Sequence, residues 1–203
     1  MIGVINYGLG NVLAFANIFK KLGVPFRVIN ERSDLKNVDK LVLPGVGAFD
    51  NAVSSFERSG LRGGVEKLIF ENKCPVLGIC VGFQMMAVSS EEGKCSGLGW
   101  IDANVVRFNT AALPAGSPLP HMGWNHLEVL QDDPILADLH TSRFYFLHSF
   151  HVVSRNPNLV LAQSEYGKKF CSIVRHNNIY GIQCHPEKSH YFGVKLLKNF
   201  SEI

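Results

Sequence analysis

The sequence predicts one α/β domain, built on a mixed and mostly parallel sheet that is flanked by helices and extended by antiparallel strands. From Met1 to Met86, apolar runs of strand length alternate with stretches of helical periodicity, and this βαβ order implies parallel strands with right-handed crossovers. After Met86, short extended runs follow one another without helices, which favours antiparallel pairing. The 203 residues suit one domain with a sizeable core, and we expect it to span residues 1–203.

The first half contains the predicted parallel strands and their crossover helices. Apolar runs place strands at Ile2–Ile5, Pro25–Ile29, Lys40–Leu43 and Val76–Ile79. Helical spacing places helices at Val12–Leu22, from Asp50, at Leu61–Phe70 and from Val81 through Val88. Gly23 directly follows the first helix, and we expect it to cap that helix because glycine readily adopts the left-handed conformation.

The second half is expected to add short strands and to end in a helix. Extended runs lie at Asn104–Phe108, Leu127–Leu130, Phe144–Val153, Val160–Ser164 and Ile179–Cys184. The final helix would bury Leu196, Leu197 and Phe200. Glycine, proline and polar residues place loops at Ser89–Gly99 and Thr110–Pro120.

Two stretches of the second half combine apolar and polar residues in a way that leaves two readings open. Because Phe144–His151 is apolar on both faces, we expect a buried central strand there. His148 and Ser149 within it are either satisfied core groups or part of a substrate pocket. Pro120–Asn125 is expected outside the strands, with Trp124 either packed in the core or, at a surface, anchoring an interface.

Composition argues against several kinds of partner and site. A net charge of +3 without dense Lys or Arg runs does not suggest a nucleic-acid surface, although a partner with an acidic face is compatible with it. Five widely spaced cysteines, with no Cys-x-x-Cys pair, make a disulfide framework or zinc site unexpected. The start lacks a basic signal region, and no apolar run approaches membrane-spanning length, so we expect a cytoplasmic protein. Cys184, His185 and His190 lack standard ligand spacing, and we expect neither metal nor cofactor.

The stretch Gly78-Ile-Cys80-Val-Gly82 has the layout of a nucleophile elbow. An apolar run stops at Cys80 and a helical pattern begins at once, which predicts a sharp turn that exposes the central side chain above the sheet. The flanking glycines are expected because neither neighbour leaves room for a Cβ and the central residue is strained. The following helix would favour the thiolate. The alternative is a buried packing cysteine in an ordinary βα turn.

A histidine and a carboxylate follow the last predicted strand. His185 and Glu187 are two residues apart, so both can point the same way. A histidine in this setting can act as base toward a cysteine while the carboxylate orients the imidazole. The glycine-rich loop Pro44–Gly47 lies at the same predicted sheet edge and could aim a backbone N–H at an oxyanion. These parts together indicate acyl transfer through a thioester.

Several motifs together resemble a known family. Gly78-Ile-Cys80-Val-Gly-Phe-Gln84 with His185-Pro-Glu187 is similar to the class I, or triad, glutamine amidotransferases, and implies their flavodoxin-like fold. A narrower resemblance is to the glutaminase subunit of imidazole glycerol phosphate synthase, in histidine biosynthesis. It is carried, over essentially the whole chain, by Asn6-Tyr-Gly-Leu-Gly-Asn11, Pro44-Gly-Val-Gly-Ala-Phe49, Pro120-His-Met-Gly-Trp-Asn125, Tyr145-Phe-Leu-His-Ser149, His185-Pro-Glu-Lys-Ser189 and Leu-Leu-Lys-Asn-Phe200.

The resemblance implies hydrolysis of L-glutamine to glutamate and ammonia, and transfer of the ammonia to a cyclase (β/α)8-barrel subunit in a heterodimer. It implies Cys80 as nucleophile, His185 as base and then acid, and Glu187 as the group that orients His185. The implied oxyanion hole comprises Gly45, Val46 and Val81. Glutamine would be held by Gly47, Gln84, Ser149 and Phe150. The face toward the cyclase would include Asn11, Trp124, Asn125, Tyr145 and Lys188.

Three positions depart from the common pattern of this family. Cys184 stands where phenylalanine is usual, Val81 replaces leucine and Phe150 replaces tyrosine. None removes a catalytic group, but they leave three alternatives open. The chain could feed ammonia to another synthase, such as one that amidates a surface-polysaccharide sugar. It could be a stand-alone γ-glutamyl hydrolase, or a scaffold that has lost the chemistry.

The oxyanion loop also suggests a means of regulation. Val46 is β-branched and resists positive φ. We therefore expect its loop to rest with the oxyanion peptide turned away, and docking of the synthase to shift that population.

Overall fold

The computed structural model describes residues 1–113 and 116–203. Its largest sheet contains both parallel and antiparallel strands. The strand order is β2-β1-β3-β4-β13-β12-β11-β8. Its parallel part comprises β1 (Ile2–Ile5), β2 (Phe26–Ile29), β3 (Lys40–Leu43), β4 (Val76–Ile79) and β13 (Ile179–Ile182). These strands confirm the parallel half of the predicted fold. Of the predicted loop Thr110–Pro120, Pro114 and Ala115 lie outside the described residues.

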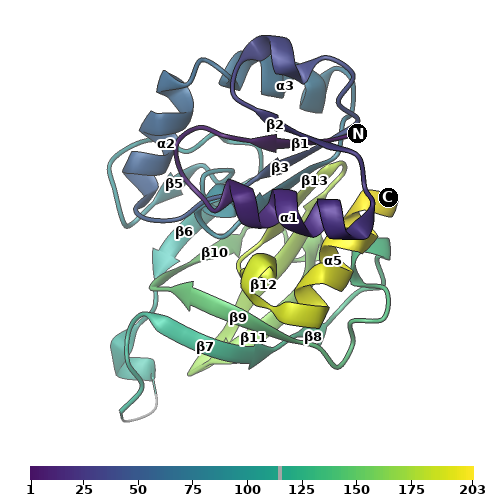
Figure 1. Cartoon of the computed structure of the whole chain (residues 1–203). Coiled ribbons are helices and arrows are strands. Elements are labelled where there is room, and N and C mark those ends of the chain that lie inside the picture. Colours follow the sequence, from purple (N-terminus) through teal and green to yellow (C-terminus); the bar gives the residue numbers. More distant parts are fainter. Residues whose placement is uncertain (114–115) are drawn as a thin grey trace.

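Helices cover both faces of the parallel strands (Figure 1). α1 (Val12–Leu22) and α5 (His190–Glu202) contact each other on one side, whereas α2 (Phe49–Arg58) and α3 (Arg62–Phe70) lie on the other. Right-handed crossovers account for this division, because the chain moves along the sheet in opposite directions after β1 and after β3. Gly23 caps α1 with a φ of 67°, as predicted.

The antiparallel extension is also present. β12 (Lys168–His176) pairs antiparallel with β13 and with β11 (Val160–Tyr166), and β8 (Glu128–Val129) completes this edge. The sequence prediction missed β12. Its ends are charged, at Lys168-Lys169 and Arg175-His176, so its apolar centre is too short to stand out as a strand of this length.

Two smaller sheets correct the predictions for the second half. One contains β10 (Phe150–Ser154), β6 (Ala103–Arg107) and β5 (Ser89–Ser90), and the other pairs β7 (His121–His126) with β9 (Arg143–His148). The prediction of one buried central strand over Phe144–His151 is therefore wrong, because the chain changes sheets at Ser149. The placement of Pro120–Asn125 outside the strands is also wrong, since β7 occupies most of it. Trp124 is 41% exposed, which fits the surface reading.

The 3₁₀ helices are short connectors, at Arg32–Leu35, Thr110–Ala112, Pro134–Leu136, Pro157–Leu159 and Pro186–Lys188. Within the described part of the chain, no helix has both the length and the apolar character needed to cross a membrane.

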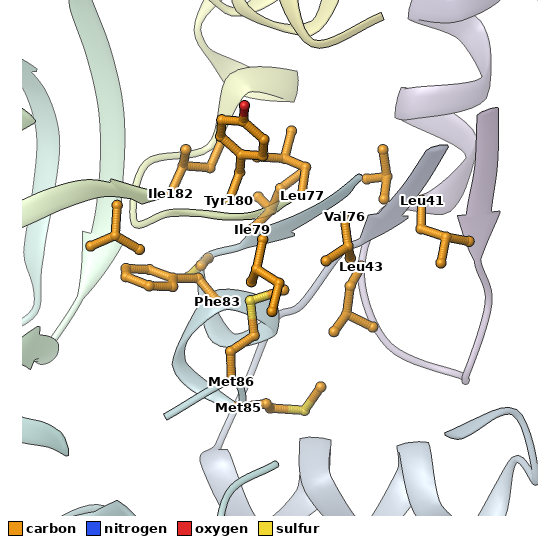
Figure 2. Close-up of a cluster of buried hydrophobic side chains, with 14 of the residues drawn as sticks. Leu41, Leu43, Val76, Leu77, Ile79, Phe83, Met85, Met86, Tyr180 and Ile182 are labelled. Carbon is orange, nitrogen blue, oxygen red and sulfur yellow. The ribbon is translucent and has the colours of Figure 1, made fainter. Parts of the chain in front are cut away.

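Buried apolar side chains surround β4 and hold its carboxyl end, where Cys80 follows, in a fixed position. Figure 2 shows the apolar side chains of β3, β4 and β13 beside those of Phe83, Met85 and Met86, all of them buried. β4 lies between β3 and β13, and the Cys80 N–H donates to the Ile182 carbonyl at 2.8 Å. Cys80 is thus held at the carboxyl end of a central strand, where α/β proteins place their sites.

Three buried histidines predict acid sensitivity: His121 on β7, His148 on β9 and His151 on β10. Burial lowers the pKa of His121 to about 4, of His148 to about 3 and of His151 to about 4. An unfolded histidine has a pKa near 6.5, so below that pH the unfolded chain binds protons that the folded chain excludes. The free energy of unfolding should therefore fall as the pH drops from about 6.5 toward 4, by about 1.4 kcal/mol per pH unit for each histidine.

Denaturant unfolding at pH 7.5 and 5.5 measures this loss. The variant His148→Phe should lose less stability between the two pH values than the wild type, because it lacks one of the three groups. Equal losses in the two proteins would contradict the role assigned to burial.

Candidate active site

The turn at Cys80 has the geometry that the sequence predicts. Cys80 has φ 54° and ψ −113°, a strained conformation for a residue with a side chain. A Cβ on Gly78 would lie 2.9 Å from the Gly82 carbonyl oxygen, and one on Gly82 would lie 2.1 Å from the Leu43 carbonyl oxygen. Both glycines are therefore required by close packing.

The helix after Cys80 is shorter than predicted. α4 (Val81–Gln84) ends before Met85, whereas the apolar pattern predicted helix through Val88. The carbonyls of Met85, Met86 and Ala87 instead accept N–H groups from Leu98, Ile101 and Gly99. A single helical turn has little dipole, so the predicted help of the helix to the thiolate is small. The Val81 N–H remains in the first turn, where helical N–H groups lack intrahelical partners.

His185 and Glu187 are joined by a buried hydrogen bond. His185 Nδ1 lies 2.8 Å from Glu187 Oε1, and both side chains are 3% exposed. The backbone of His185 is held from both sides: its N–H donates to the Tyr145 carbonyl at 2.8 Å, and its carbonyl accepts from the Ser189 hydroxyl at 2.6 Å. The carboxylate therefore fixes the imidazole orientation and leaves the other ring nitrogen free to face the nucleophile.

Cys80 and His185 line the same cavity, whose volume is about 330 Å³. Adjacent parallel strands bring them together, because Ile79 of β4 is in register with Ile182 of β13. Burial lowers the pKa of the His185 imidazole, but hydrogen bonds and charge interactions with Cys80 and Glu187 outweigh it and raise the pKa to about 10. The histidine is thus protonated at neutral pH when it faces a thiolate.

This raised pKa predicts the pH dependence of turnover. If His185 must carry a proton for the leaving amine, kcat/KM should stay level through neutral pH and fall only as His185 deprotonates near pH 10. Glu187→Gln removes a group that raises this pKa, so the alkaline limb should move down by about 1 pH unit or more. A pH profile of glutamine hydrolysis, measured for both proteins, makes the comparison. An alkaline limb that stays in place would show that Glu187 does not tune His185.

The loop predicted to form the oxyanion hole is pressed against the elbow. The Tyr7 hydroxyl donates to the Pro44 carbonyl at 2.7 Å. A Cβ on Gly45 would lie 2.1 Å from the Gly82 nitrogen, so these two backbones touch. Val46 and Gly47 line the cavity, and the positive φ of the loop falls on Gly47, at 89°. Val46 avoids positive φ, as its β-branched side chain requires.

The structure also places the other predicted glutamine-binding residues at this cavity. Gln84, Ser149 and Phe150 line it together with Val81. Pro120, Leu147, His148 and Lys188 line it as well. Leu147 explains part of the apolar character of β9: Phe144 and Phe146 are buried in the core, and Leu147, on the opposite face, lines the cavity.

Sequence reasoning missed Glu92, which also lines the cavity. Its Oε2 accepts the Phe49 N–H at 2.9 Å. Asp50, which was expected to start a helix, lies in the first turn of α2 and accepts the N–H groups of Lys94 and Cys95 at 2.9 and 3.0 Å. Through these hydrogen bonds, the two carboxylates hold the polar segment Ser89–Gly99 against the first turn of α2. Both contacts span more than forty residues, so nothing local signals them.

Three of the five predicted interface residues, Trp124, Tyr145 and Lys188, gather on β7, β9 and the turn after His185. The Trp124 and Tyr145 rings meet edge to face at 6.2 Å, and Lys188 Nζ lies 5.7 Å from the centre of the Tyr145 ring. Asn125 follows Trp124 on β7 but points to the opposite face, where its amide donates to the Glu165 carbonyl at 2.8 Å. Asn11 lies apart from this group as the N-cap of α1, although α1 contacts the turn that contains Lys188.

Across residues 1–113 and 116–203, no three or more His, Cys, Asp or Glu residues are grouped so as to hold a metal ion.

Comparison with known proteins gives the family. The model of the family "Glutamine amidotransferase class-I" matches residues 3–202. "Imidazole glycerol phosphate synthase subunit HisH" of Bdellovibrio bacteriovorus is 48% identical over 204 residues, with 100% of both chains covered. The protein of the same name from Leptospira interrogans is 43% identical, again with 100% of both chains covered.

Solved structures show the same fold at lower identity. A putative GMP synthase subunit from Thermoplasma acidophilum superposes with a TM-score of 0.74 at 24% identity, covering 99% of this chain and 92% of that one. PurLQS from Thermotoga maritima gives a TM-score of 0.75 at 18% identity, covering 99% and 97%. The chain therefore belongs to the class-I glutamine amidotransferases and, within them, to the family of the imidazole glycerol phosphate synthase subunit HisH.

Proposed function

We propose that this protein hydrolyses L-glutamine to glutamate and ammonia, and delivers the ammonia to a synthase partner that makes imidazole glycerol phosphate in histidine biosynthesis in the cytoplasm. One observation carries the chemistry: a strained cysteine and a histidine that is hydrogen-bonded to a carboxylate line one cavity at the ends of adjacent strands. The names of the relatives support the pathway.

The arrangement suits a thioester mechanism. The Cys80 thiolate attacks the side-chain carboxamide carbon, and the carbonyl oxygen takes up negative charge. The Val81 N–H and a peptide N–H of Gly45–Val46 would stabilise that charge. His185 gives its proton to the departing nitrogen, which leaves as ammonia, and a γ-glutamyl thioester remains on Cys80. His185 then takes a proton from water as the hydroxide attacks the thioester, and glutamate is released with the thiolate restored.

The cavity can also recognise the amino-acid end of glutamine. The Glu92 carboxylate lies at its wall and complements an α-ammonium group. Gln84 lines the cavity with both of its amide hydrogens already donated, to the Phe150 carbonyl and to Gln183. Its carbonyl oxygen is therefore the end that can accept from the substrate.

We infer that the face around Trp124, Tyr145 and Lys188 docks a cyclase (β/α)8 barrel to form a heterodimer. An exposed tryptophan stacked on His190, with ring centres 5.4 Å apart, is a typical interface anchor. Docking next to the Lys188 turn would also reach the site, because Lys188 lines the cavity.

Glutamine turnover with and without the cyclase subunit tests this proposal. We expect the free chain to hydrolyse glutamine slowly and the complex to do so faster, because docking would turn the Gly45–Val46 peptide toward the oxyanion. Trp124→Ala should weaken the complex by about 2 kcal/mol, or about thirty-fold in Kd. Fast hydrolysis by the free chain would favour a stand-alone hydrolase. Activation only by a different synthase would favour the paralogous role.

A further inference from the structure

A buried amide contacts the sulfur of Cys80. Gln183 is fully buried, and its Nε2 lies 3.8 Å from Cys80 Sγ, within the range of an N–H···S hydrogen bond. The Leu147 carbonyl is a second neighbour of the sulfur, at 4.0 Å. A thiol can donate to that carbonyl, but a thiolate can only accept. Of these two groups, only the Gln183 amide can stabilise the charged nucleophile.

The direction of this hydrogen bond follows from the Phe150 carbonyl, which can only accept. Gln84 Nε2 lies 3.0 Å from that oxygen, so the nitrogen end of the Gln84 amide faces it. The same nitrogen lies 3.1 Å from the Gln183 amide, which must therefore present its oxygen to Gln84. The nitrogen of Gln183 is then left to face the sulfur. Exchanging the ends of either amide would set two donors or two acceptors against each other.

A second chain of hydrogen bonds also ends at the Phe150 carbonyl. His148 Nδ1 lies 2.7 Å from that oxygen and must donate to it. His148 Nε2 is then the acceptor in its 3.1 Å contact with His121 Nδ1. His121 Nε2 in turn accepts from Asn125 Nδ2 at 3.3 Å. This arrangement of donors and acceptors requires the imidazole rings of His121 and His148 to be neutral. Burial lowers the pKa of both rings well below 7, so both are neutral at that pH.

We propose that Gln183 is a further catalytic residue, which donates its amide hydrogen to the Cys80 thiolate in an orientation imposed by Gln84 and the Phe150 carbonyl. The proposal rests on the proposed role of Cys80 as nucleophile. Gln183 would stabilise the thiolate before glutamine arrives, a task for which α4 is too short. Gln183 directly follows β13, and β13 pairs with β4, the strand that leads into Cys80.

Alkylation of Cys80 by iodoacetamide, followed as a function of pH by peptide mass spectrometry, tests this in the full-length chain. Gln183→Met keeps the side-chain length and removes the donor, so the alkylation midpoint should rise by about one pH unit. Tyr7, Cys184 and His185 interact electrostatically with Cys80, and the substitution leaves all three in place. The matched control is His151→Phe, because His151 is buried beside Phe150 but has no bond in either chain. Its midpoint should equal that of the wild type.

The outcomes separate this proposal from the proposed function. Cys80 is more buried than Cys95, so the two cysteines are compared by the pH midpoint of alkylation and not by its rate. If the midpoint of wild-type Cys80 is no lower than that of Cys95, Cys80 is not an activated nucleophile and both proposals fail. If wild-type Cys80 is reactive but the Gln183→Met midpoint is unchanged, only the role of Gln183 is overturned.

A second measurement covers the case in which Gln183→Met does not fold. In the wild type, the side-chain ¹⁵N amide signal of Gln183 should shift with pH at the midpoint of Cys80 alkylation. A signal that stays constant through that midpoint would overturn the proposal.

Discussion

Cys80→Ala is expected to abolish glutamine hydrolysis while the complex still makes product from added ammonium salt. Loss of a covalent nucleophile costs about 10⁴-fold or more in kcat, because no other group can form the thioester. Alanine fits the site, since it only removes a sulfur that already borders a cavity. Parallel assays with glutamine and with ammonium salt, on the variant mixed with the cyclase subunit, measure the two activities separately.

The ammonium assay is the internal control of that experiment. A variant that has lost both activities would show that Cys80 supports the fold or the interface, contrary to its assigned role. Retained glutamine hydrolysis would remove Cys80 from the chemistry altogether.

Gly82→Ala is expected to reduce both stability and glutamine turnover. The added methyl group would lie 2.1 Å from the Leu43 carbonyl oxygen and 3.1 Å from the Pro44 carbonyl carbon. A backbone atom cannot move without the residues bonded to it, so relief of this clash must shift the oxyanion loop relative to Cys80. We expect a loss of about 3 kcal/mol in the free energy of unfolding, and about a hundred-fold loss in kcat/KM from misplaced oxyanion donors.

Gly63→Ala is the matched control for this prediction. Gly63 is helical, and the nearest heavy atom to an added Cβ is Arg32 Nη2, at 3.9 Å. The substitution should stabilise α3 by about 0.5–1 kcal/mol and leave turnover unchanged. Thermal unfolding and steady-state kinetics report both effects. Equal effects of the two substitutions would mean that the elbow packing has no special role.

The parallel half of the fold could be predicted because its signals are local. The run Val76–Ile79 and the helical spacing of Val12–Leu22 each encode one element, and both appear with the predicted bounds. The second half depends on pairings between distant segments. Phe144–Val153 looks like one strand until β7 and β6 take its two halves into different sheets.

The same distinction applies to the site. Cys80, His185 and Glu187 stand in short motifs whose spacing already implies their geometry, and the structure brings them to one cavity or into contact. Glu92 and Gln183 have no such motif. They reach the site through contacts with Phe49 and Gln84, 43 and 99 residues away along the chain. Only the folded chain shows these contacts.

The γ-glutamyl thioester offers the most direct test of the central claim. The chain is mixed with its cyclase partner and L-glutamine, quenched in acid during turnover, digested and examined by peptide mass spectrometry. Fragment spectra that assign the modified residue are needed because Cys74 and Cys80 lie only six residues apart. We predict a γ-glutamyl adduct on Cys80 and none on the other four cysteines. Ammonia production without any adduct on Cys80, or with the adduct on another cysteine, would contradict the account.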